Sequence, residues 1–435
     1  MNFLDEFYSY VSSIDLQKFI RIFWFFVFFE FLRFFVLDFT TVSLWWLTRR
    51  FRRKRREAAR RELWEQQPLV SVIVPGKNEG RHIFRLAQSL KEQTYRNFEL
   101  IIIDDGSDDD TPAICSSLKK NKLIDLYLRN DVRGGKASAA NLGLRFARGE
   151  FVVHLDADCS YDRDAIENIL LPFFYDKSVG AVGGNVQVRN YKKSLCATLQ
   201  AIEYFDTISV GRIATSELGI YRVISGAFGA FRREALARVG GWDIGPGLDG
   251  DITVKVRKLG YRIRFEPTAV CKTSVPENFR ALIRQRLRWD KSLIRFRLRK
   301  HCDVFYPNET FRWSNFISFV ENVMYNLVLN LKWYVYIADM VVNFASYIPF
   351  ILLMNILLYS LSNVVKYLMF SLFRAYRNEP IGYFIPYLPV MVLYFGYYLR
   401  LVRSIAYVQE LFFKASYNDP WNPPKSSRHA KALKI

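Results

Sequence analysis

Two aspartates, Asp156 and Asp158, follow directly on the apolar run Phe151–Leu155. Their carboxylates are hard oxygen ligands of the kind that Mg²⁺ and Mn²⁺ prefer. A solvated turn after a strand would also explain two such residues, since an Asp-x-Asp pair often arises by chance. At the end of a buried strand the pair is more informative, because ligands bind beyond the carboxyl ends of parallel strands. We therefore expect Asp156 and Asp158 to hold Mg²⁺ or Mn²⁺.

Other acidic residues also stand at strand ends. Asp104 and Asp105 end the run that begins at Phe98, and Glu79 follows the run that begins at Val70. A polar loop or a helix cap by Ser107 would explain these residues separately. Because the carboxyl ends of parallel strands share one edge of a sheet, their recurrence predicts a single site.

Lys136 stands just inside an expected helix, after Gly134 and Gly135. Main-chain N–H groups at a helix start, together with an ammonium group, could hold a phosphate. The spacing does not match the P-loop of nucleotide triphosphatases. A surface lysine is the simpler alternative.

The elements that must position these residues have the pattern of an α/β fold. Apolar, β-branched runs begin at Val70, Phe98, Phe151 and Tyr261, and helix-like stretches separate the first three. Continuous apolar strands that alternate with helices predict a mostly parallel sheet covered on both faces.

Both ends of the chain are apolar. Ile20–Leu47 would be about 42 Å long as a helix, which allows one tilted transmembrane span. Its charged residues Glu30, Arg33 and Asp38 should face a partner helix or an aqueous path, because charges are costly in lipid. Three further candidate spans are 316–344, 347–373 and 381–401, with Arg374 and Arg377 at an expected cytoplasmic turn. Their number, and the side on which the basic tail lies, stay open.

The net charge of +20 is partly gathered in nine Arg or Lys between Arg49 and Arg61. Basic residues just after an apolar segment indicate a cytoplasmic flank on anionic lipid. No nucleic-acid motif accompanies them, so we do not expect nucleic acid as a partner. The five cysteines form no CxxC pair, which indicates free thiols rather than a zinc site.

A basic amphipathic segment, Phe279–His301, contains the sequence Gln285-Arg286-Leu287-Arg288-Trp289. Such a segment suits a helix at a membrane surface. Together with Asp104-Asp105, Asp156-Ala157-Asp158 and Asp249, it resembles the family 2 processive glycosyltransferases, which include cellulose, chitin and hyaluronan synthases. The resemblance covers roughly residues 69 to 300. It implies a GT-A (Rossmann-like) cytosolic domain joined to transmembrane and interfacial helices.

The resemblance also implies roles for individual residues. The implied nucleotide and donor contacts are Pro75, Glu79, Asp104, Asp105, Lys136 and Asp156. Asp249 aligns with the catalytic base, although Leu248 stands where the family usually has an acid. Asp251 is the alternative base, and the missing acid leaves the register open.

On the acceptor side, the resemblance assigns Trp289 to the acceptor sugar and Arg286 and Arg288 to the diphosphate, with Gln285 holding the acceptor end. Gly226, in Ser225–Arg233, would allow close approach of a sugar, although a tight turn explains this loop equally well. Trp421 is more readily an interfacial anchor than part of a lid over the donor.

The function implied is an inverting, metal-dependent transfer from UDP-glucose or UDP-N-acetylglucosamine to a growing β-linked polysaccharide, which is secreted. A single transfer to a lipid or glycolipid is one alternative, and a non-catalytic scaffold or channel subunit is another. Expected partners are the donor, the polysaccharide, the bilayer and accessory secretion subunits. The expected location is a bacterial-type inner or plasma membrane, with the catalytic domain cytoplasmic. The expected organisation is 1–48 with one span, 49–68 basic linker, 69–275 catalytic domain, 276–312 interface helices, 313–413 transmembrane region and 414–435 basic tail.

Overall fold

The computed structural model describes residues 3–243, 247–372, 380–418 and 423–432. Internal contacts divide the chain into two compact units. The first, here called the helical unit, is Met1–Leu47 with Val320–Ser404. The second, here called the sheet unit, is Thr48–Phe319 with Ile405–Ile435.

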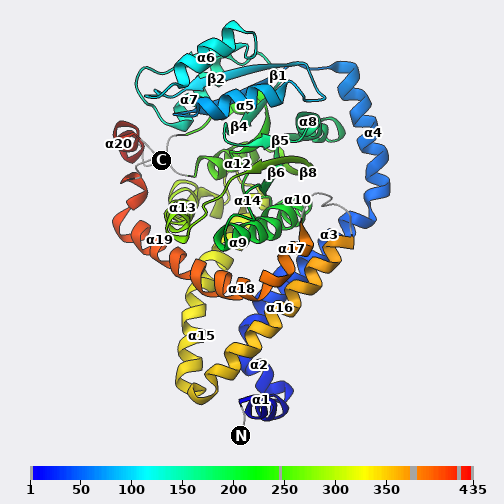
Figure 1. Cartoon of the computed structure of the whole chain (residues 1–435), viewed down its shortest axis with the longest axis vertical. Coiled ribbons are helices and arrows are strands. Elements are labelled where there is room, and N and C mark those ends of the chain that lie inside the picture. Colours follow the sequence, from blue (N-terminus) through cyan, green and yellow to red (C-terminus); the bar gives the residue numbers. More distant parts are fainter. Residues whose placement is uncertain (1–2, 244–246, 373–379, 419–422, 433–435) are drawn as a thin grey trace. The chain divides into compact units, whose positions relative to one another are not determined.

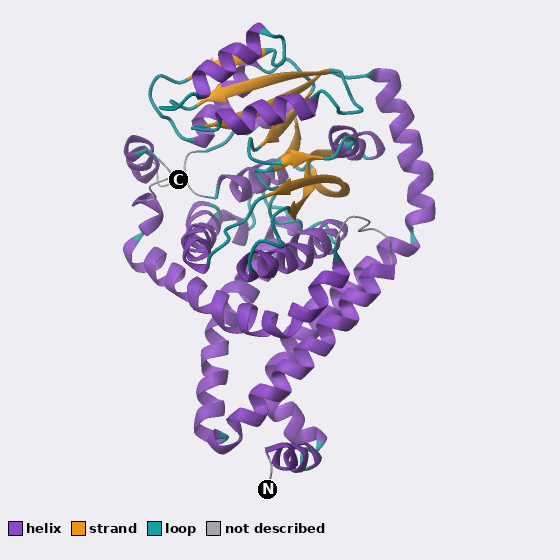
Figure 2. Cartoon of the chain, in the orientation of Figure 1, coloured by secondary structure: helices purple, strands orange, loops and turns teal. Residues whose placement is uncertain are grey.

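A mixed sheet forms the centre of the sheet unit (Figure 2). Its strands are β1 (Val70–Gly76), β2 (Phe98–Asp104), β3 (Leu126–Arg129), β4 (Phe151–Leu155), β5 (Ser160–Tyr161), β6 (Val179–Val188), β7 (Phe228–Arg232) and β8 (Arg262–Thr273). Their order is β3-β2-β1-β4-β7-β6-β8-β5. Four pairings are parallel and three are antiparallel, the latter being β4–β7, β6–β7 and β5–β8. The expected mostly parallel sheet is therefore confirmed in a mixed form.

The strands that carry the acidic motifs are buried along their length. Every residue of β4 is buried, as are Val70 to Pro75 of β1. Such strands need apolar side chains on both faces, which explains their continuous Val, Ile and Leu runs. Since β1 is parallel to both β2 and β4, their carboxyl ends share one edge. This edge carries Glu79, Asp104 and Asp156.

Helices cover this sheet (Figure 1), with α7 packed on β1 and β2 and α8 packed on β6 and β8. Those of the sheet unit are α4 (Arg49–Gln66), α5 (Gly80–Leu90), α6 (Thr111–Lys120), α7 (Lys136–Phe146), α8 (Ala165–Tyr175), α9 (Leu195–Tyr204), α10 (Gly211–Glu217), α11 (Arg233–Arg238), α12 (Leu248–Lys258), α13 (Phe279–Ser292) and α20 (Pro424–Ala432).

The four expected strands are present as β1, β2, β4 and β8, whereas β3, β5, β6 and β7 were not predicted. The sequence of β6 contains three glycines, which are depleted in strands. The segment Ser225–Arg233, expected to be a loop on the acceptor side, contains β7 in the middle of the sheet. Only its first residues form the turn that leads into the strand.

The basic segment after the first apolar run forms the helix α4, and part of it contacts the sheet unit. Arg52 pairs with Glu217 at 2.7 Å, Arg56 with Glu266 at 2.9 Å and Arg60 with Glu167 at 2.6 Å. These arginines are spaced by four residues and so share one helix face. Their charges are directed at acids of the sheet unit, whereas Arg53, Lys54 and Arg55 are exposed. The expected cytoplasmic flank on anionic lipid stays a prediction.

Part of the segment expected at the membrane surface also turns basic residues inward, although Arg280 and Arg284 are exposed. After α13, a π-helical segment covers Leu293–Lys300. The side chains of Arg295 and Arg297 are buried, and Arg299 pairs with Glu410 at 2.7 Å. Buried arginines need partners to offset the loss of hydration. This segment is therefore built into the sheet unit.

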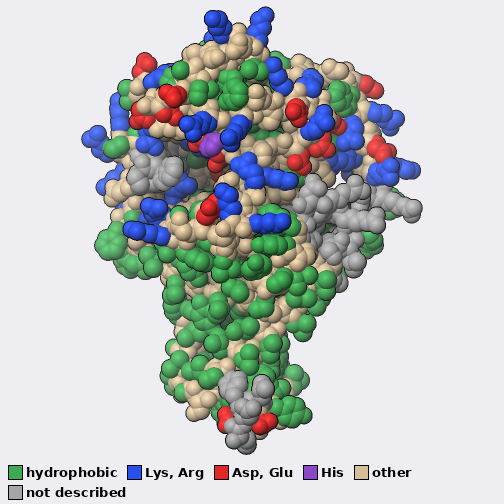
Figure 3. Space-filling model, viewed as in Figure 1, with side chains coloured by type: hydrophobic (Ala, Val, Ile, Leu, Met, Phe, Trp, Pro, Cys, Tyr) green, Lys and Arg blue, Asp and Glu red, His purple; other side chains and the backbone are tan. Residues whose placement is uncertain are grey.

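The apolar ends form a series of helices. Their bounds are α1 (Phe3–Ser12), α2 (Leu16–Phe25), α3 (Asp38–Leu47), α14 (Trp313–Val323), α15 (Leu329–Asn343), α16 (Ile348–Leu372), α17 (Ile381–Phe384), α18 (Leu388–Leu393) and α19 (Leu399–Phe413). A π-helical segment, Phe26–Leu37, joins α2 to α3. On the face shown in Figure 3, hydrophobic side chains cover much of the helical unit.

By length and composition, two helices of the described chain could cross a membrane, Ala345–Leu368 and Gly382–Phe413. They correspond to the second and third expected C-terminal spans. The expected spans Ile20–Leu47 and 316–344 are largely helical but do not meet these criteria of length, hydropathy and charge. Arg374 and Arg377 lie outside the described residues.

The charges within the first apolar segment have partners, as expected. Arg33 pairs with Asp38 at 2.7 Å and with Glu321 at 2.9 Å. Glu30 accepts a hydrogen bond from Arg400. These ion pairs join sequence-distant helices of the helical unit and remove the need for solvent at these charges.

Candidate active site

The end of β4 and the start of α7 bring a lysine and an aspartate into contact. Lys136 Nζ lies 2.6 Å from Asp156 Oδ1. Burial alone would lower the pKa of Lys136, but the charges of Asp156 and Asp249 outweigh burial and raise that pKa. The ammonium is therefore held in its charged form between two carboxylates.

Asp158 stands beside this ion pair and has few bonds of its own. Its Oδ1 is 3.5 Å from the Cys159 thiol, which is a weak donor. Among the described residues, no cluster of three or more His, Cys, Asp or Glu could hold a metal ion. Mg²⁺ is commonly held by one or two carboxylates, with water and substrate phosphates completing its shell. Asp156 and Asp158 fit that kind of site, which needs a phosphate-bearing ligand to be complete.

Asp249 lies in the first turn of α12 and is held by a glycine from another element. Its Oδ2 accepts a hydrogen bond from the Gly226 N–H at 2.9 Å. Burial raises the pKa of Asp249 and the charge of Asp156 raises it further, while Lys136 and the Gly226 N–H oppose the rise. A carboxylate with a raised pKa can accept a proton more readily near neutral pH.

Asp251, two residues later, has other partners. Its Oδ1 lies 2.7 Å from His301 Nε2 and 2.8 Å from Lys300 Nζ. Despite burial, which raises the pKa of this carboxyl, these partners lower it to about 2. Asp251 is 4% exposed and serves as the anion of a buried ion-pair cluster. The geometry thus separates the roles of the two aspartates.

The two aspartates at the end of β2 hold a neighbouring loop. Asp104 is fully buried and accepts hydrogen bonds from Ser107 N at 2.8 Å and Tyr127 Oη at 3.1 Å. Asp105 accepts from the main-chain N–H groups of Gly134 at 2.8 Å and Gly135 at 2.7 Å. Asp105 thereby fixes the turn that delivers Lys136, a role that sequence reasoning did not assign.

Pro75 and Glu79 lie at the end of β1. Pro75 is buried within the strand and pairs in register with Ile103. Glu79 precedes α5, and its Oε2 is 2.6 Å from His82 Nδ1. Burial raises the pKa of Glu79, His82 opposes the rise, and the charges of Asp158 and Asp156 add to it. Glu79 is therefore electrostatically part of the group around Asp156.

The sequence Gln285–Trp289 lies on α13. Arg286 is buried, with Nη2 2.8 Å from Glu203 Oε2, and its guanidinium lies 4.6 Å from the centre of the Trp289 ring. Trp289 is 39% exposed, which leaves part of the ring available. Gln285 Oε1 is buried without a hydrogen-bond partner in the described structure. Arg286 thus joins α13 to α9 and supports the Trp289 ring. Arg288, also on α13, is half-buried.

Two site residues were not anticipated from the sequence. His154, on β4, is 2% exposed and its Nδ1 lies 2.7 Å from the Gly226 carbonyl oxygen. Arg212, on α10, lowers the pKa of Asp249 through its charge. His154 could have been noticed as a lone histidine within a buried apolar strand, whereas Arg212 belongs to no recognisable motif. Trp421 lies outside the described residues.

Part of this chain matches a known protein family. Residues 71–240 match the family model described as Glycosyl transferase family 2. The chain therefore carries a family 2 glycosyltransferase domain, and this domain includes Lys136, Asp156 and Gly226.

Two curated relatives share the name poly-beta-1,6-N-acetyl-D-glucosamine synthase. The protein from Staphylococcus aureus (strain COL) is 33% identical over 257 residues, which are 59% of this chain and 61% of the relative. The protein from Staphylococcus epidermidis is 37% identical over 225 residues, which are 51% of this chain and 53% of the relative. The chain thus matches less than two thirds of the length of either relative.

A solved structure is similar in fold. It is a mannosyltransferase from Pyrobaculum calidifontis in complex with GDP-Man and Mn²⁺. The TM-score is 0.55 at 22% identity, and the match covers 86% of this chain and 99% of that one. At this identity the likeness concerns the fold, which is GT-A-like.

Proposed function

We propose that this protein is an inverting, metal-dependent glycosyltransferase that polymerises a UDP-sugar into a β-linked polysaccharide. The contact of Lys136 with Asp156 at 2.6 Å, beside Asp249, carries the proposal. It brings a cation for phosphate, a metal-type carboxylate and a buried base candidate into one site. The relatives' name favours UDP-N-acetylglucosamine over UDP-glucose as the donor.

The donor's diphosphate is the group that needs positive charge. Asp156 and Asp158 would hold Mg²⁺ or Mn²⁺, and that ion would offset the charge of the leaving diphosphate. Lys136 would contribute a second positive charge from the start of α7. Asp104 and Asp105 would act on the nucleotide mainly by fixing the loop before α7, because their oxygens already accept bonds within the protein.

Asp249 is the proposed general base. It would accept the proton of the acceptor hydroxyl as that oxygen attacks the anomeric carbon, which inverts the configuration there. Its raised pKa suits this role, and the Gly226 N–H fixes one carboxylate oxygen so that the other can face the acceptor.

Trp289 is the proposed platform for the acceptor sugar. An exposed ring can stack on a sugar face without fixing one register, which suits a polymer that advances after each transfer. We assign Arg288 and Gln285 to the same acceptor and diphosphate region, with Arg286 supporting the Trp289 ring. Ala345–Leu368 and Gly382–Phe413 support placement in a membrane, with secretion of the product and a cytoplasmic catalytic domain as part of the proposal.

The test uses full-length protein purified in detergent. It is incubated with radiolabelled UDP-N-acetylglucosamine or UDP-glucose and with Mg²⁺ or Mn²⁺, and the product is sized and digested with linkage-specific hydrolases. The proposal expects long, digestible polymer from one donor. Short or lipid-extractable product would instead indicate a single transfer, and no turnover of either donor would contradict the proposed activity.

A further inference from the structure

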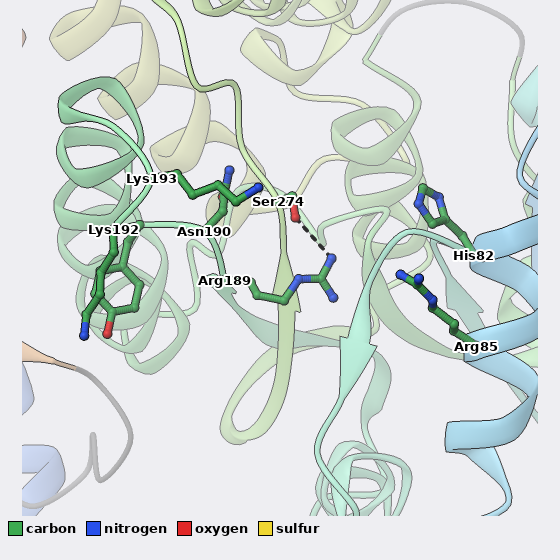
Figure 4. Close-up of a pocket in the computed structure, with 8 residues that line it drawn as sticks. His82, Arg85, Arg189, Asn190, Lys192, Lys193 and Ser274 are labelled. Carbon is green, nitrogen blue, oxygen red and sulfur yellow. Dashed lines mark hydrogen bonds between the residues drawn. The ribbon is translucent and has the colours of Figure 1, made fainter.

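A pocket of about 690 Å³ lies on the sheet unit beside the proposed metal ligands. Its lining is mostly basic and polar, with residues from α5, from the segment after β6 and from the end of β8 (Figure 4). The lining residues are His82, Arg85, Arg189, Asn190, Tyr191, Lys192, Lys193 and Ser274. We call this the basic pocket. Its volume lies within the range of small-molecule sites, and its lining suits a charged ligand.

Two arginines give the basic pocket its unbalanced charge. Figure 4 shows the guanidinium ends of Arg85 and Arg189 extending toward each other across the pocket. Among the described residues neither has a carboxylate partner, whereas Lys193 pairs with Glu277 at 3.2 Å. Like charges that line a concave surface repel one another and focus the field on an anion.

Arg189 is held in place by neutral groups. Its Nη2 donates to the Asp158 carbonyl oxygen at 3.0 Å and to Ser274 Oγ at 3.1 Å, and its Nη1 donates to Ser160 Oγ at 3.3 Å. These bonds orient the planar guanidinium without neutralising it. A fixed guanidinium matches phosphate oxygens well, because it presents paired N–H groups in a rigid fork.

The basic pocket also borders the candidate active site on two sides. Arg189 bonds to the main chain of Asp158, and His82 Nδ1 is 2.6 Å from Glu79 Oε2. A ligand held by Arg85 and Arg189 would therefore lie next to the carboxylates that we assign to the metal and the donor.

We propose that the basic pocket binds a phosphate-bearing anion of the phosphate or diphosphate class through Arg85 and Arg189. Anion binding in this pocket does not depend on the proposed function. The identification of the anion as the donor's own diphosphate does rest on the proposed function. A free phosphate or diphosphate has the same chemistry and is the other source.

The experiment measures binding of radiolabelled inorganic pyrophosphate to the purified full-length protein, by equilibrium dialysis in EDTA. Wild-type protein should bind, and Arg85→Gln should weaken binding by about tenfold, the value of one charged hydrogen-bonded contact. Arg85→Gln together with Arg189→Gln should weaken it further. Arg81→Gln is the matched control, because it removes the same charge from an exposed position of α5 outside the pocket.

Lys136→Gln locates the bound anion. Pyrophosphate binding that is lost in Lys136→Gln but unchanged in Arg85→Gln would overturn the proposal, since the anion would then occupy the donor site alone. Absence of binding to wild-type protein would overturn it as well, even if sugar transfer is normal. If wild-type protein binds pyrophosphate in a way that depends on Arg85 but transfers no sugar, only the proposed function is contradicted.

Competition with UDP separates the two sources in the same dialysis. Displacement of pyrophosphate by UDP, with UDP binding also weakened in Arg85→Gln, would assign the pocket to the donor's diphosphate. Simultaneous binding of both would assign it to a separate anion. Either result supports an anion site at the basic pocket.

Discussion

Gly226 donates its main-chain N–H to Asp249 Oδ2 at 2.9 Å, so the conformation of one peptide sets the position of the proposed base. The carbonyl oxygen of the same glycine lies 2.7 Å from His154 Nδ1. The carbonyl can only accept, so His154 carries its proton on Nδ1. Strand β4 therefore holds Asp249 indirectly, through Gly226.

Gly226→Ala should impair catalysis more than stability. A Cβ at this position would meet Asp249 Oδ1 at 2.6 Å and Oδ2 at 2.9 Å, so the carboxylate must move. We expect a loss in kcat of at least about a hundredfold, as for a misplaced general base. The matched control is Gly396→Ala, where an added Cβ meets nothing within 4 Å. Equal kcat values for the two variants would contradict this positioning role.

Asp249→Asn should mainly lower activity, whereas Asp251→Asn should mainly lower stability. The first removes the proposed base and should lower kcat by about 10²–10⁴-fold with little change in melting temperature. The second removes the buried anion that Lys300 and His301 share, although Lys300 keeps its contact with Asp243, and should cost roughly 3 kcal/mol of unfolding free energy. Kinetics and thermal unfolding of both variants test this. Full activity of Asp249→Asn would remove it as the base.

His154 should make the protein less stable in mild acid. Burial, aided by the charge of Lys136, lowers the pKa of His154 to about 4. An unfolded imidazole titrates near 6.5, so the folded state resists protonation. The corresponding stability is complete above about pH 6.5 and is lost as the pH falls toward about 4, by roughly 3 kcal/mol in all.

Denaturant unfolding of His154→Gln measures this contribution. The loss of stability between neutral pH and about pH 4.5 should be smaller in the variant than in wild type. The same pH dependence in wild type and His154→Gln would show that another group titrates.

Arg286→Ala and Trp289→Ala distinguish the structural role of Arg286 from the proposed acceptor binding by Trp289. Arg286→Ala removes the cation that pairs with the buried Glu203 at 2.8 Å and should destabilise by roughly 3–5 kcal/mol. Trp289→Ala should keep its melting temperature and raise KM for an oligosaccharide acceptor about tenfold, the value of one stacking contact. Trp313→Ala, at an exposed tryptophan, is the control. An unchanged KM in Trp289→Ala would place the acceptor elsewhere.

Metal removal should stop sugar transfer reversibly. EDTA should abolish activity, and Mn²⁺ or Mg²⁺ should restore it, because the diphosphate needs a divalent partner. Asp158→Asn should raise the metal concentration needed for half-maximal activity by about tenfold or more. Asp164→Asn, at an exposed aspartate nearby, should behave as wild type. Full activity in EDTA would contradict the assigned metal site.

The ends of these strands were predictable because buried strands have continuous runs of apolar residues, and each run ends where the strand ends. Val70, Phe98 and Phe151 each begin a run that is a strand in the structure. The position of Asp249 beside Lys136 was not predictable from spacing, since it depends on Gly226 at the entry to β7. That strand has a short, glycine-containing sequence with weak strand propensity.

The partners of the basic residues could not be predicted, because composition does not say which way a long side chain points. From charge alone, Arg56 belonged to an expected cytoplasmic flank and Arg295 to an expected helix at the membrane surface. In the structure, Arg56 pairs with Glu266, and Arg295 lies 4.6 Å from the centre of the Tyr417 ring. The acids and rings that bind them lie far away in the sequence, so local patterns could not reveal them.

The arginine face of α4 determines where a fragment that contains the sheet unit should begin. A fragment that begins at Leu69, just before β1, would leave Glu167 and Glu266 buried without their cations. Unpaired buried carboxylates favour the unfolded state and aggregation during expression. A fragment that begins at Thr48 retains these partners, so a screen of truncations should give monodisperse protein only from the longer form.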